Sequence, residues 1–371
     1  MLKTIGFPGR YVQGEGALSS LGRILREMGL ARPLAIIDPV VGKDLWPKVA
    51  ASLSGHELQA AMLEFPGECT REVIAQLASE AKPCRPGVIV ALGGGKTIDT
   101  AKGVARALRL PVVVCPTIAS SDAPTSRLIV LYDSLHKLVG VDYMDRNPDA
   151  VVVDTAVIVQ APARFFAAGV GDAISKKFEA EQCDRAQGAN SFGTRPLNTA
   201  LLLARTTYDV LQRSAINAYH SVGQGIVTSD VEDVVEATVL LSGVGFESGG
   251  LSLAHALVRG LTAIPEMAGN LHGEIVAFGT IVQMLGDGRP ESEIKGLIEL
   301  LAALNLPITL KDLGQEKPLM DEQLTTIVTA TLATNYSKNM LPPLTAARLE
   351  QCLVRADRVG TQWYLSSQWA T

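Results

Sequence analysis

The chain has 371 residues, of which 47% are hydrophobic and 19% charged, and its net charge is −5. This length favours two domains with a sizeable core, and the negative charge argues against nucleic acid or an anionic membrane as a partner. Five cysteines without a C-x-x-C pair are typical of a cytosolic protein and indicate neither a disulfide framework nor a zinc–cysteine site. The start, MLKTIGFPGRY, has no apolar signal core, and no uncharged apolar run approaches the ~20 residues that span a bilayer. We therefore expect a cytoplasmic protein that binds neither nucleic acid nor membrane.

Up to about Pro162 the chain alternates between short β-rich runs and helical patterns. The predicted strands are Leu34–Ile37, Gln59–Phe65, Gly87–Leu92, Pro111–Cys115 and Ala150–Asp154, and the predicted helices are Lys43–Leu53, a Thr70-capped helix running to Ala81, and Thr97–Leu108. Ser126–Tyr132 and Lys137–Tyr143 flank Asp133–His136 and predict a hairpin. Strands that alternate with helices predict a parallel sheet with helices on both faces.

Beyond Pro162, alanine- and leucine-rich helical periodicity replaces the strand-like runs. The predicted helices include Arg164–Gln182, Asn198–Leu211, Val231–Leu241, Ser252–Leu261, Glu291–Leu304 and Glu322–Thr334. We therefore predict an α/β domain over residues 1–161 and an all-α domain over residues 162–371. A cleft between two such domains is a usual place for a ligand site.

Gly87–Lys102 reads as a strand, a glycine turn and a helix, GVIVALGGGKTIDTAK. The backbone N–H groups at such a helix N-terminus hold phosphate well, and Lys96 and Thr97 add contacts. A Walker A pattern fails because Val90 replaces its first glycine, and the dinucleotide fingerprint fails because Ile98 replaces its third. A plain tight turn therefore remains the alternative to a phosphate-binding loop.

Asp38 follows the first predicted strand, where an acid can accept hydrogen bonds from the ribose hydroxyls of NAD and repel the extra phosphate of NADP. An ordinary acid at a strand end is the alternative. The loop Pro116–Tyr132 is dense in hydroxyls and small residues, which suits a bound ligand, and Asp122 within it has room to face a cleft.

Two of the five histidines, His255 and His272, lie in the apolar, glycine-rich stretch Gly243–Thr280. Each is either a core histidine with its ring nitrogens satisfied locally or a ligand. A metal site would need a third ligand from elsewhere in the chain.

Nine segments taken together resemble the glycerol dehydrogenases of the iron-containing alcohol dehydrogenase superfamily. They occur in the family's order and are FPGECT (Phe65–Thr70), ALGGGKTIDTAK (Ala91–Lys102), PTIASSDAPTS (Pro116–Ser126), NPDAVVVDT (Asn147–Thr155), APARFFAAGVGDA (Ala161–Ala173), FEAEQC (Phe178–Cys183), LSGVGFESGGL (Leu241–Leu251), GLTAIP (Gly260–Pro265) and HGEIVAFGT (His272–Thr280). The resemblance implies a Rossmann-like parallel-sheet domain that binds NAD, followed by a helical domain that binds metal, as in the dehydroquinate synthase-like architecture.

The resemblance also implies the site residues. Asp172, in GVGDA, would bind a divalent metal together with His255 and His272, and zinc is the expected ion, with Fe²⁺ as the alternative. Asp122 would lie beside the substrate hydroxyls as the candidate catalytic residue. Homo-oligomers are usual in the family. The implied NAD contacts are Asp38, Gly94, Gly95, Lys96, Thr97, Thr117, Ser120, Ser126, Leu128 and Tyr132.

Several positions depart from the family pattern. Val258 stands where a second histidine is common, and EMAGNL (Glu266–Leu271) replaces an aromatic and histidine-rich segment. Lys176 and Lys177 stand where Thr and Trp are frequent, and Arg127 replaces a small residue. A solvated surface charge is the plain interpretation of each basic residue. Together they make a hydroxy-acid or a phosphorylated polyol the alternative to glycerol as the substrate.

These patterns leave three hypotheses. The first is an NAD- and zinc-dependent dehydrogenase that oxidises a secondary hydroxyl of a polyol, with glycerol to dihydroxyacetone as the default reaction. A superfamily dehydrogenase for a hydroxy-acid or phosphorylated polyol is its close variant. The second is a dehydroquinate synthase-like lyase, which regenerates its NAD within the cycle. The third is a non-catalytic nucleotide-binding module, against which the intact Asp-His-His set argues.

Overall fold

The computed structural model describes residues 2–134 and 136–367, and these form two compact units. The α/β unit contains Gly6–Pro162 and Ser221–Gly243, whereas the helical unit contains the N-terminal segment up to Ile5, Ala163–His220 and the chain from Val244 onward. The division into domains of residues 1–161 and 162–371 remains a proposal. The compact units differ from it in two segments: the N-terminal segment up to Ile5 belongs to the helical unit, and Ser221–Gly243 belongs to the α/β unit.

A six-stranded, fully parallel sheet forms the centre of the α/β unit, with the strand order β1-β8-β5-β4-β2-β3. Its strands are β1 (Tyr11–Gly14), β2 (Pro33–Ile37), β3 (Ala61–Glu64), β4 (Val88–Gly93), β5 (Val112–Pro116) and β8 (Ala150–Asp154). All five strands predicted for this sheet are present. The strand β1 was not predicted, because a four-residue, half-buried edge strand contains no continuous apolar run.

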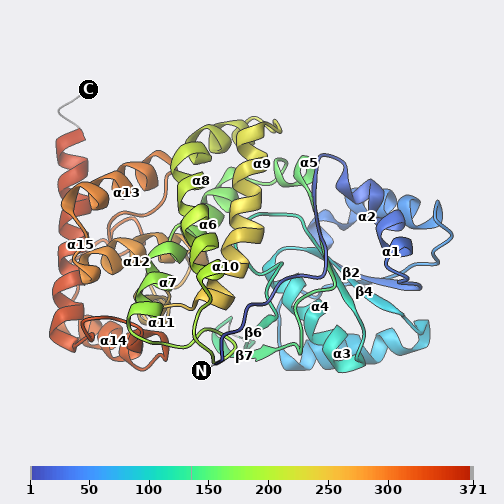
Figure 1. The fold of residues 1–371 in the computed structure, drawn as a ribbon, viewed down its shortest axis with the longest axis horizontal. Helices are drawn as coiled ribbons and strands as arrows, with labels where there is room; N and C mark the ends of the chain where they lie inside the picture. Colours follow the sequence, from blue (N-terminus) through green and yellow to red (C-terminus); the bar gives the residue numbers. More distant parts are fainter. Residues whose placement is uncertain (1, 135, 368–371) are drawn as a thin grey trace. The chain divides into compact units, whose positions relative to one another are not determined.

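Helices cover both faces of this sheet (Figure 1). The helices α1 (Leu21–Glu27) and α2 (Pro39–Ser54) pack on one face, and α3 (Arg71–Ala81) and α4 (Gly95–Leu108) pack together on the other. The chain runs from β2 outward to β3 and then returns to pair β4 on the opposite side of β2. The carboxyl ends of β2 and β4 therefore form a topological switch point, where ligands of α/β sheets usually bind.

Two local predictions in this unit are confirmed. Thr70 caps α3, because its Oγ1 accepts a hydrogen bond of 3.1 Å from the backbone N–H of Val73. The predicted hairpin is a separate antiparallel pair of β6 (Leu128–Tyr132) and β7 (Leu138–Tyr143). Leu135, in its predicted turn, lies outside the described residues.

The chain after residue 162 contains no β-strand within its described part, which agrees with the predicted all-helical texture. Its longer helices are α6 (Ala163–Ala173), α7 (Lys176–Arg185), α8 (Asn198–Gly223), α9 (Ser229–Val235), α10 (Ser242–Gly249), α11 (Leu253–Leu261), α12 (His272–Asp287), α13 (Glu291–Ala303), α14 (Asp321–Leu332) and α15 (Ala346–Ser367), with a π-helical stretch, η3 (Glu236–Leu241), joining α9 to α10. The predicted α/β plus all-α fold class is confirmed.

One predicted helix, Arg164–Gln182, is divided between α6 and α7. At the break the Ser175 hydroxyl donates a 2.9 Å hydrogen bond to the carbonyl of Asp172. Serine side chains compete in this way with the backbone ladder of a helix.

The helix α12 is central to the helical unit, where it packs against α6, α7, α11, α13 and α15. Thirteen of its sixteen residues are buried. A helix that is buried all round has no polar face, so its sequence lacks the amphipathic period that reveals surface helices.

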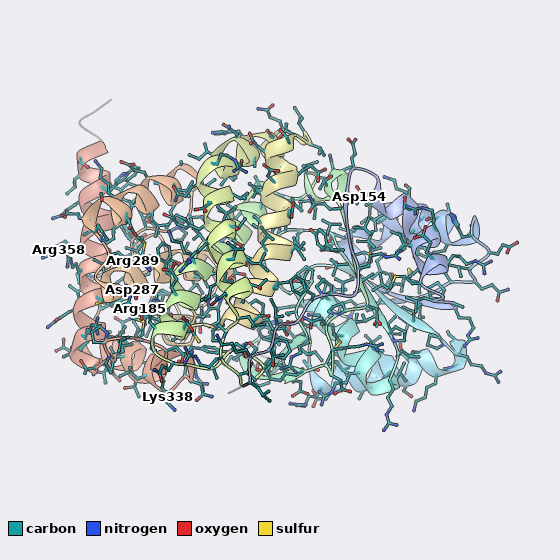
Figure 2. All side chains as sticks on the ribbon, in the orientation of Figure 1. Asp154, Arg185, Asp287, Arg289, Lys338 and Arg358 are labelled. Carbon is teal, nitrogen blue, oxygen red and sulfur yellow. The ribbon has the colours of Figure 1, made fainter. Side chains whose placement is uncertain are left out.

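A polar cluster lies at the end of α12, where Figure 2 labels Asp287 and Arg289. Asp287 Oδ1 accepts hydrogen bonds from Gln182 Nε2 at 2.7 Å and Gln283 Nε2 at 2.9 Å, and Oδ2 is 3.6 Å from Arg289 Nε. Burial raises the pKa of Asp287 to about 7, although Arg289 opposes the shift.

Within the described residues no single helix is long and apolar enough to cross a membrane. The bent pair Ser229–Gly249 and Leu253–Leu261 meets that test by length and composition, as buried core helices of other proteins also do.

Candidate metal centre and cofactor-binding loop

Three potential metal ligands from distant parts of the sequence converge in the helical unit. Asp172 is near the end of α6, His255 is in α11, and His272 begins α12. Their ligand atoms all lie within 4.8 Å of one another. His255 Nε2 is 3.3 Å, and His272 Nε2 3.7 Å, from Asp172 Oδ1. The structure thus brings together the three residues that the sequence analysis selected as metal ligands.

Close backbone packing sets the separation of two of these ligands. A Cβ on Gly273 would lie 1.7 Å from the carbonyl oxygen of Ala168, and one on Gly171 would lie 2.5 Å from the carbonyl oxygen of Gly273. Only glycine therefore permits the approach of α6 to α12 at these points. Arg164 and Glu274 add a bidentate ion pair between the same helices, at 2.5 and 2.8 Å.

Glu179 fixes the orientation of His255. Its Oε2 is 2.6 Å from His255 Nδ1, while its Oε1 accepts from the backbone N–H groups of His255 at 3.0 Å and Ser252 at 2.9 Å. This carboxylate therefore satisfies free N–H groups at the start of α11 and leaves Nε2 of the ring directed at Asp172. Glu179 was not among the predicted site residues, although it lies in the matching segment FEAEQC.

Lys176 also reaches this cluster. Its side chain is completely buried, and Nζ donates a 2.6 Å hydrogen bond to Asp172 Oδ1 and lies 3.1 Å from His255 Nε2. The interpretation of Lys176 as a solvated surface charge is therefore wrong. Lys177, by contrast, is half-buried, and its Nζ lies 4.0 Å from the ring centroid of Tyr208.

Burial and the neighbouring charged side chains shift the pKa values of Asp172 and His255. Burial alone would raise the pKa of Asp172, but the ammonium of Lys176 and the hydrogen bond from His255 outweigh burial and hold that pKa well below its usual range. Burial also opposes protonation of His255, yet the carboxylate of Glu179 raises the pKa of His255 to about 9. The two carboxylates thus attract positive charge to this site.

The donor set fits a divalent cation. One carboxylate and two imidazoles are ligands typical of zinc and of iron(II). Asp172 Oδ2 is buried and has no hydrogen-bond partner among the described residues, so its lone pairs are available to an ion.

The second candidate site lies at the carboxyl ends of β2 and β4, in the α/β unit. Asp38 caps α2 by accepting a 2.9 Å hydrogen bond from the N–H of Val40, and Thr97 Oγ1 lies 3.4 Å from Asp38 Oδ2. A Cβ on Gly93 would lie 2.9 Å from the Cβ of Asp38. Because α4 begins at Gly95, the free N–H groups of its first turn lie at the same edge, as an anion site requires.

The remaining predicted cofactor residues lie on or near this loop region, in varied environments. Thr117 donates its N–H to the carbonyl of Gly93 at 3.1 Å. Lys96 Nζ forms a 2.6 Å ion pair with Glu68 and lies 4.9 Å from the Tyr132 ring. Ser126 is buried, whereas Ser120 and Leu128 are half-buried.

Asp122, the predicted catalytic residue, is half-buried in the loop before β6. Its Oδ2 accepts a 3.3 Å hydrogen bond from the hydroxyl of Ser242, which directly follows the π-helical stretch η3. π-Helical turns often occur at functional sites. Arg127, in the same loop, is half-buried, and its guanidinium lies 4.9 Å from the Tyr143 ring.

Comparison with known proteins identifies the family. The model of the iron-containing alcohol dehydrogenase family matches residues 8–155. Glycerol dehydrogenase of Citrobacter freundii is 38% identical, over 98% of this chain and 99% of that protein. The chain belongs to the iron-containing alcohol dehydrogenase family. Glycolaldehyde reductase of Halobacterium salinarum is 35% identical, over 95% of this chain and 96% of that protein.

The fold of this iron-containing alcohol dehydrogenase agrees closely with a solved relative. The crystal structure of glycerol dehydrogenase from Schizosaccharomyces pombe superposes with a TM-score of 0.94 and 34% identity, covering 99% of this chain and 93% of that one. The chain is accordingly a glycerol dehydrogenase-like polyol dehydrogenase.

A buried ion pair that was not predicted from the sequence connects α4 to β6 and to the loop before β6 in this dehydrogenase. Lys102 and Asp99, both on α4, are buried and 3.2 Å apart. Lys102 Nζ also donates to the carbonyls of Ala123 at 2.6 Å and Leu128 at 2.9 Å, and Asp99 accepts from the N–H of Val130 at 3.0 Å. Both residues lie in the segment Ala91–Lys102. A spacing of three on one helix is also that of an ordinary helical pair, so the sequence alone does not reveal these contacts.

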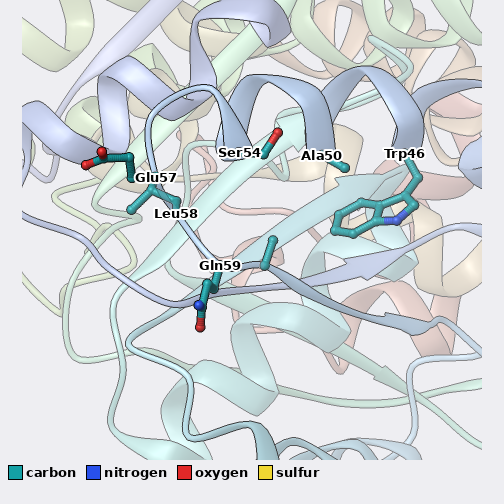
Figure 3. A pocket seen from close by; sticks show the side chains of 7 residues that line it. Trp46, Ala50, Ser54, Glu57, Leu58 and Gln59 are labelled. Atoms are coloured by element: carbon teal, nitrogen blue, oxygen red, sulfur yellow. The ribbon is translucent and has the colours of Figure 1, made fainter.

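A surface hollow of this dehydrogenase lies beside α2 (Figure 3). Its lining is Trp46, Ala50, Ser54 and the residues from Glu57 to Ala60. None of the candidate site residues contributes to it, so it is separate from both sites described above.

Proposed function

We propose that this polyol dehydrogenase uses NAD and a zinc ion to oxidise a secondary hydroxyl, with glycerol to dihydroxyacetone as its first candidate reaction. The observation that carries the proposal is the convergence of Asp172, His255 and His272 in the helical unit. Iron(II) is the alternative ion for the same donors.

The bound ion would supply a Lewis acid that polarises the substrate hydroxyl and lowers its pKa. Asp172, His255 and His272 would hold that ion, and Glu179 would keep His255 Nε2 directed at it through the contact at Nδ1. We assign Asp122 the role of contacting the substrate hydroxyls, which the hydrogen bond from Ser242 supports by orienting its carboxylate.

NAD would bind at the switch point of the α/β unit and accept the hydride. Gly94, Gly95 and Thr97 would present backbone N–H groups to the pyrophosphate, and Asp38 would accept hydrogen bonds from the ribose. The carboxylate of Asp38 would also repel a 2′-phosphate, so we propose NAD rather than NADP. The other proposed contacts are Lys96, Thr117, Ser120, Ser126, Leu128 and Tyr132.

The test is an NADH-absorbance screen of the purified, zinc-loaded protein. It covers glycerol, 1,2-propanediol, 2-hydroxy acids and glycerol phosphates, with NAD and NADP compared. A silent diol panel with an active acid or phosphate panel would replace glycerol by those substrates. Absence of net NADH and NADPH production with every compound of the panel would refute the proposed reaction and favour a lyase or a binding module.

Asp172→Ala and His255→Ala test the metal assignment. Both variants should bind NAD as the unmodified protein does while losing bound zinc and turnover. Full activity of either variant after chelation would refute the metal site. We further propose a cytoplasmic homo-oligomer, which light scattering and cell fractionation would check.

A further inference from the structure

Lys176 holds a position that lysine rarely takes. The side chain has no exposed surface, and Nζ contacts Asp172 Oδ1 at 2.6 Å and His255 Nε2 at 3.1 Å. Lysine is almost never fully buried unless its charge is paired. Here the pairing atoms belong to two of the three proposed metal ligands.

The distances place an ion that binds Asp172 Oδ1 and His255 Nε2 close to this ammonium. Asp172 Oδ1 and His255 Nε2 are 3.3 Å apart. By triangulation, an ion bonded to both atoms would lie within roughly 4 Å of Nζ, on whichever side of the pair it bound. Two cations at that separation repel strongly in a buried site.

Charge balance leads to the same conclusion. Asp172 and Glu179 supply two buried negative charges next to the imidazoles. A divalent ion alone would balance these two carboxylates, whereas a divalent ion together with the ammonium of Lys176 would leave an excess positive charge out of water.

We propose that Lys176 is a built-in cation of this site: without a divalent ion its ammonium neutralises Asp172 and keeps the ligands assembled, and an entering ion must displace it. The inference rests on the proposed metal site. It means that this chain binds divalent ions more weakly than a chain with a short neutral residue at position 176, and that its metal-free form is intrinsically stable.

The direct test measures metal affinity, without turnover. Chelator-treated protein is titrated with Co²⁺, followed by its visible absorption, and with Zn²⁺ against a chromophoric chelator. Lys176→Thr and Lys176→Met should bind both ions at least about 10-fold tighter than the unmodified protein, because the competing charge is gone. Lys177→Thr removes the same charge one residue away and should bind as the unmodified protein does.

Thermal unfolding of the same proteins supplies the second measurement. Metal-free Lys176→Met and Lys176→Thr should melt at lower temperature, since Asp172 loses its partner, and should regain stability when Co²⁺ is added. The unmodified protein should gain less from Co²⁺. A variant that binds the ion and recovers its melting temperature is folded, which separates loss of competition from loss of structure.

The other outcomes are also decisive. Equal and tight affinities in the unmodified and Lys176-substituted proteins would refute the role of Lys176 and leave the metal site standing. No binding of Co²⁺ or Zn²⁺ by any of the four proteins would refute the metal site and this inference together.

Discussion

Replacing Asp287 by asparagine should stabilise the protein, and more so at pH 8 than at pH 5. Burial raises the pKa of this carboxyl to about 7, against 3.8 as its ordinary value. Between these values the folded chain holds a proton that the unfolded chain has lost, so the free energy of unfolding falls as the pH rises. The ionised carboxylate lowers the free energy of unfolding by its full amount above pH 7. That amount is about 4 kcal/mol, at 1.36 kcal/mol per pKa unit.

The structure also limits the gain. An asparagine Oδ1 can still accept the hydrogen bonds from Gln182 and Gln283. Its amide nitrogen would face Arg289 Nε, however, where Oδ2 now lies 3.6 Å away. We therefore expect a stabilisation above pH 7 that is below about 4 kcal/mol. We expect little change near pH 4, where the folded chain keeps the carboxyl protonated and the unfolded chain, with an ordinary pKa of 3.8, is only partly ionised.

Differential scanning calorimetry from pH 4 to 8.5 would measure this effect as the difference between the variant and the unmodified protein at each pH. Asp44→Asn, at an exposed position of α2, is the matched control and should show no such pH-dependent difference. If Asp287→Asn followed the same pH profile as the unmodified protein, the assignment of a buried carboxyl whose pKa is raised to about 7 would be wrong.

Two further substitutions test the support of each site. Glu179→Gln keeps the size and the acceptor for the N–H groups of α11 but removes the charge beside His255, so zinc affinity should fall about 10–100-fold by calorimetric titration; an unchanged affinity would mean that this carboxylate does not tune the ligand. Lys102→Met leaves Asp99 buried without its ammonium and should cost about 3–5 kcal/mol in urea unfolding and weaken NAD binding. Adding Asp99→Asn should recover part of that loss, and a double variant as unstable as the sum of both changes would refute the pairing.

The α/β unit was largely predictable from the sequence because its strands are buried on both faces. Runs such as Gly87–Leu92 and Ala150–Asp154 consist almost wholly of β-favouring apolar residues, and β4 and β8 form within one residue of those bounds. The helix α12 was not predicted, because a helix buried on every side loses the alternation of faces on which such predictions depend.

The candidate site was predictable in its residue types but not in its surroundings. Family resemblance selected Asp172 to accompany His255 and His272, and the fold brings the three together. The contact between Glu179 and His255 joins residues 76 positions apart, which no local pattern reveals. Lys176 was interpreted as a surface charge because lysine usually is one. Its burial follows from the packing of α7 against α12 and from its contacts with Asp172 and His255, which only the folded chain brings together.

The contact between Gly171 and Gly273 makes the separation of two proposed ligands independent of most side chains around them. These glycines flank two of the proposed ligands, Asp172 and His272, so main-chain atoms touching main-chain atoms define the separation of those ligands. Side chains elsewhere in the helical unit can then be exchanged during evolution without altering the distance between the ligands. The substrate preference of such a protein can change by substitutions around the site while the separation of Asp172 and His272, two of the proposed ligands, is kept.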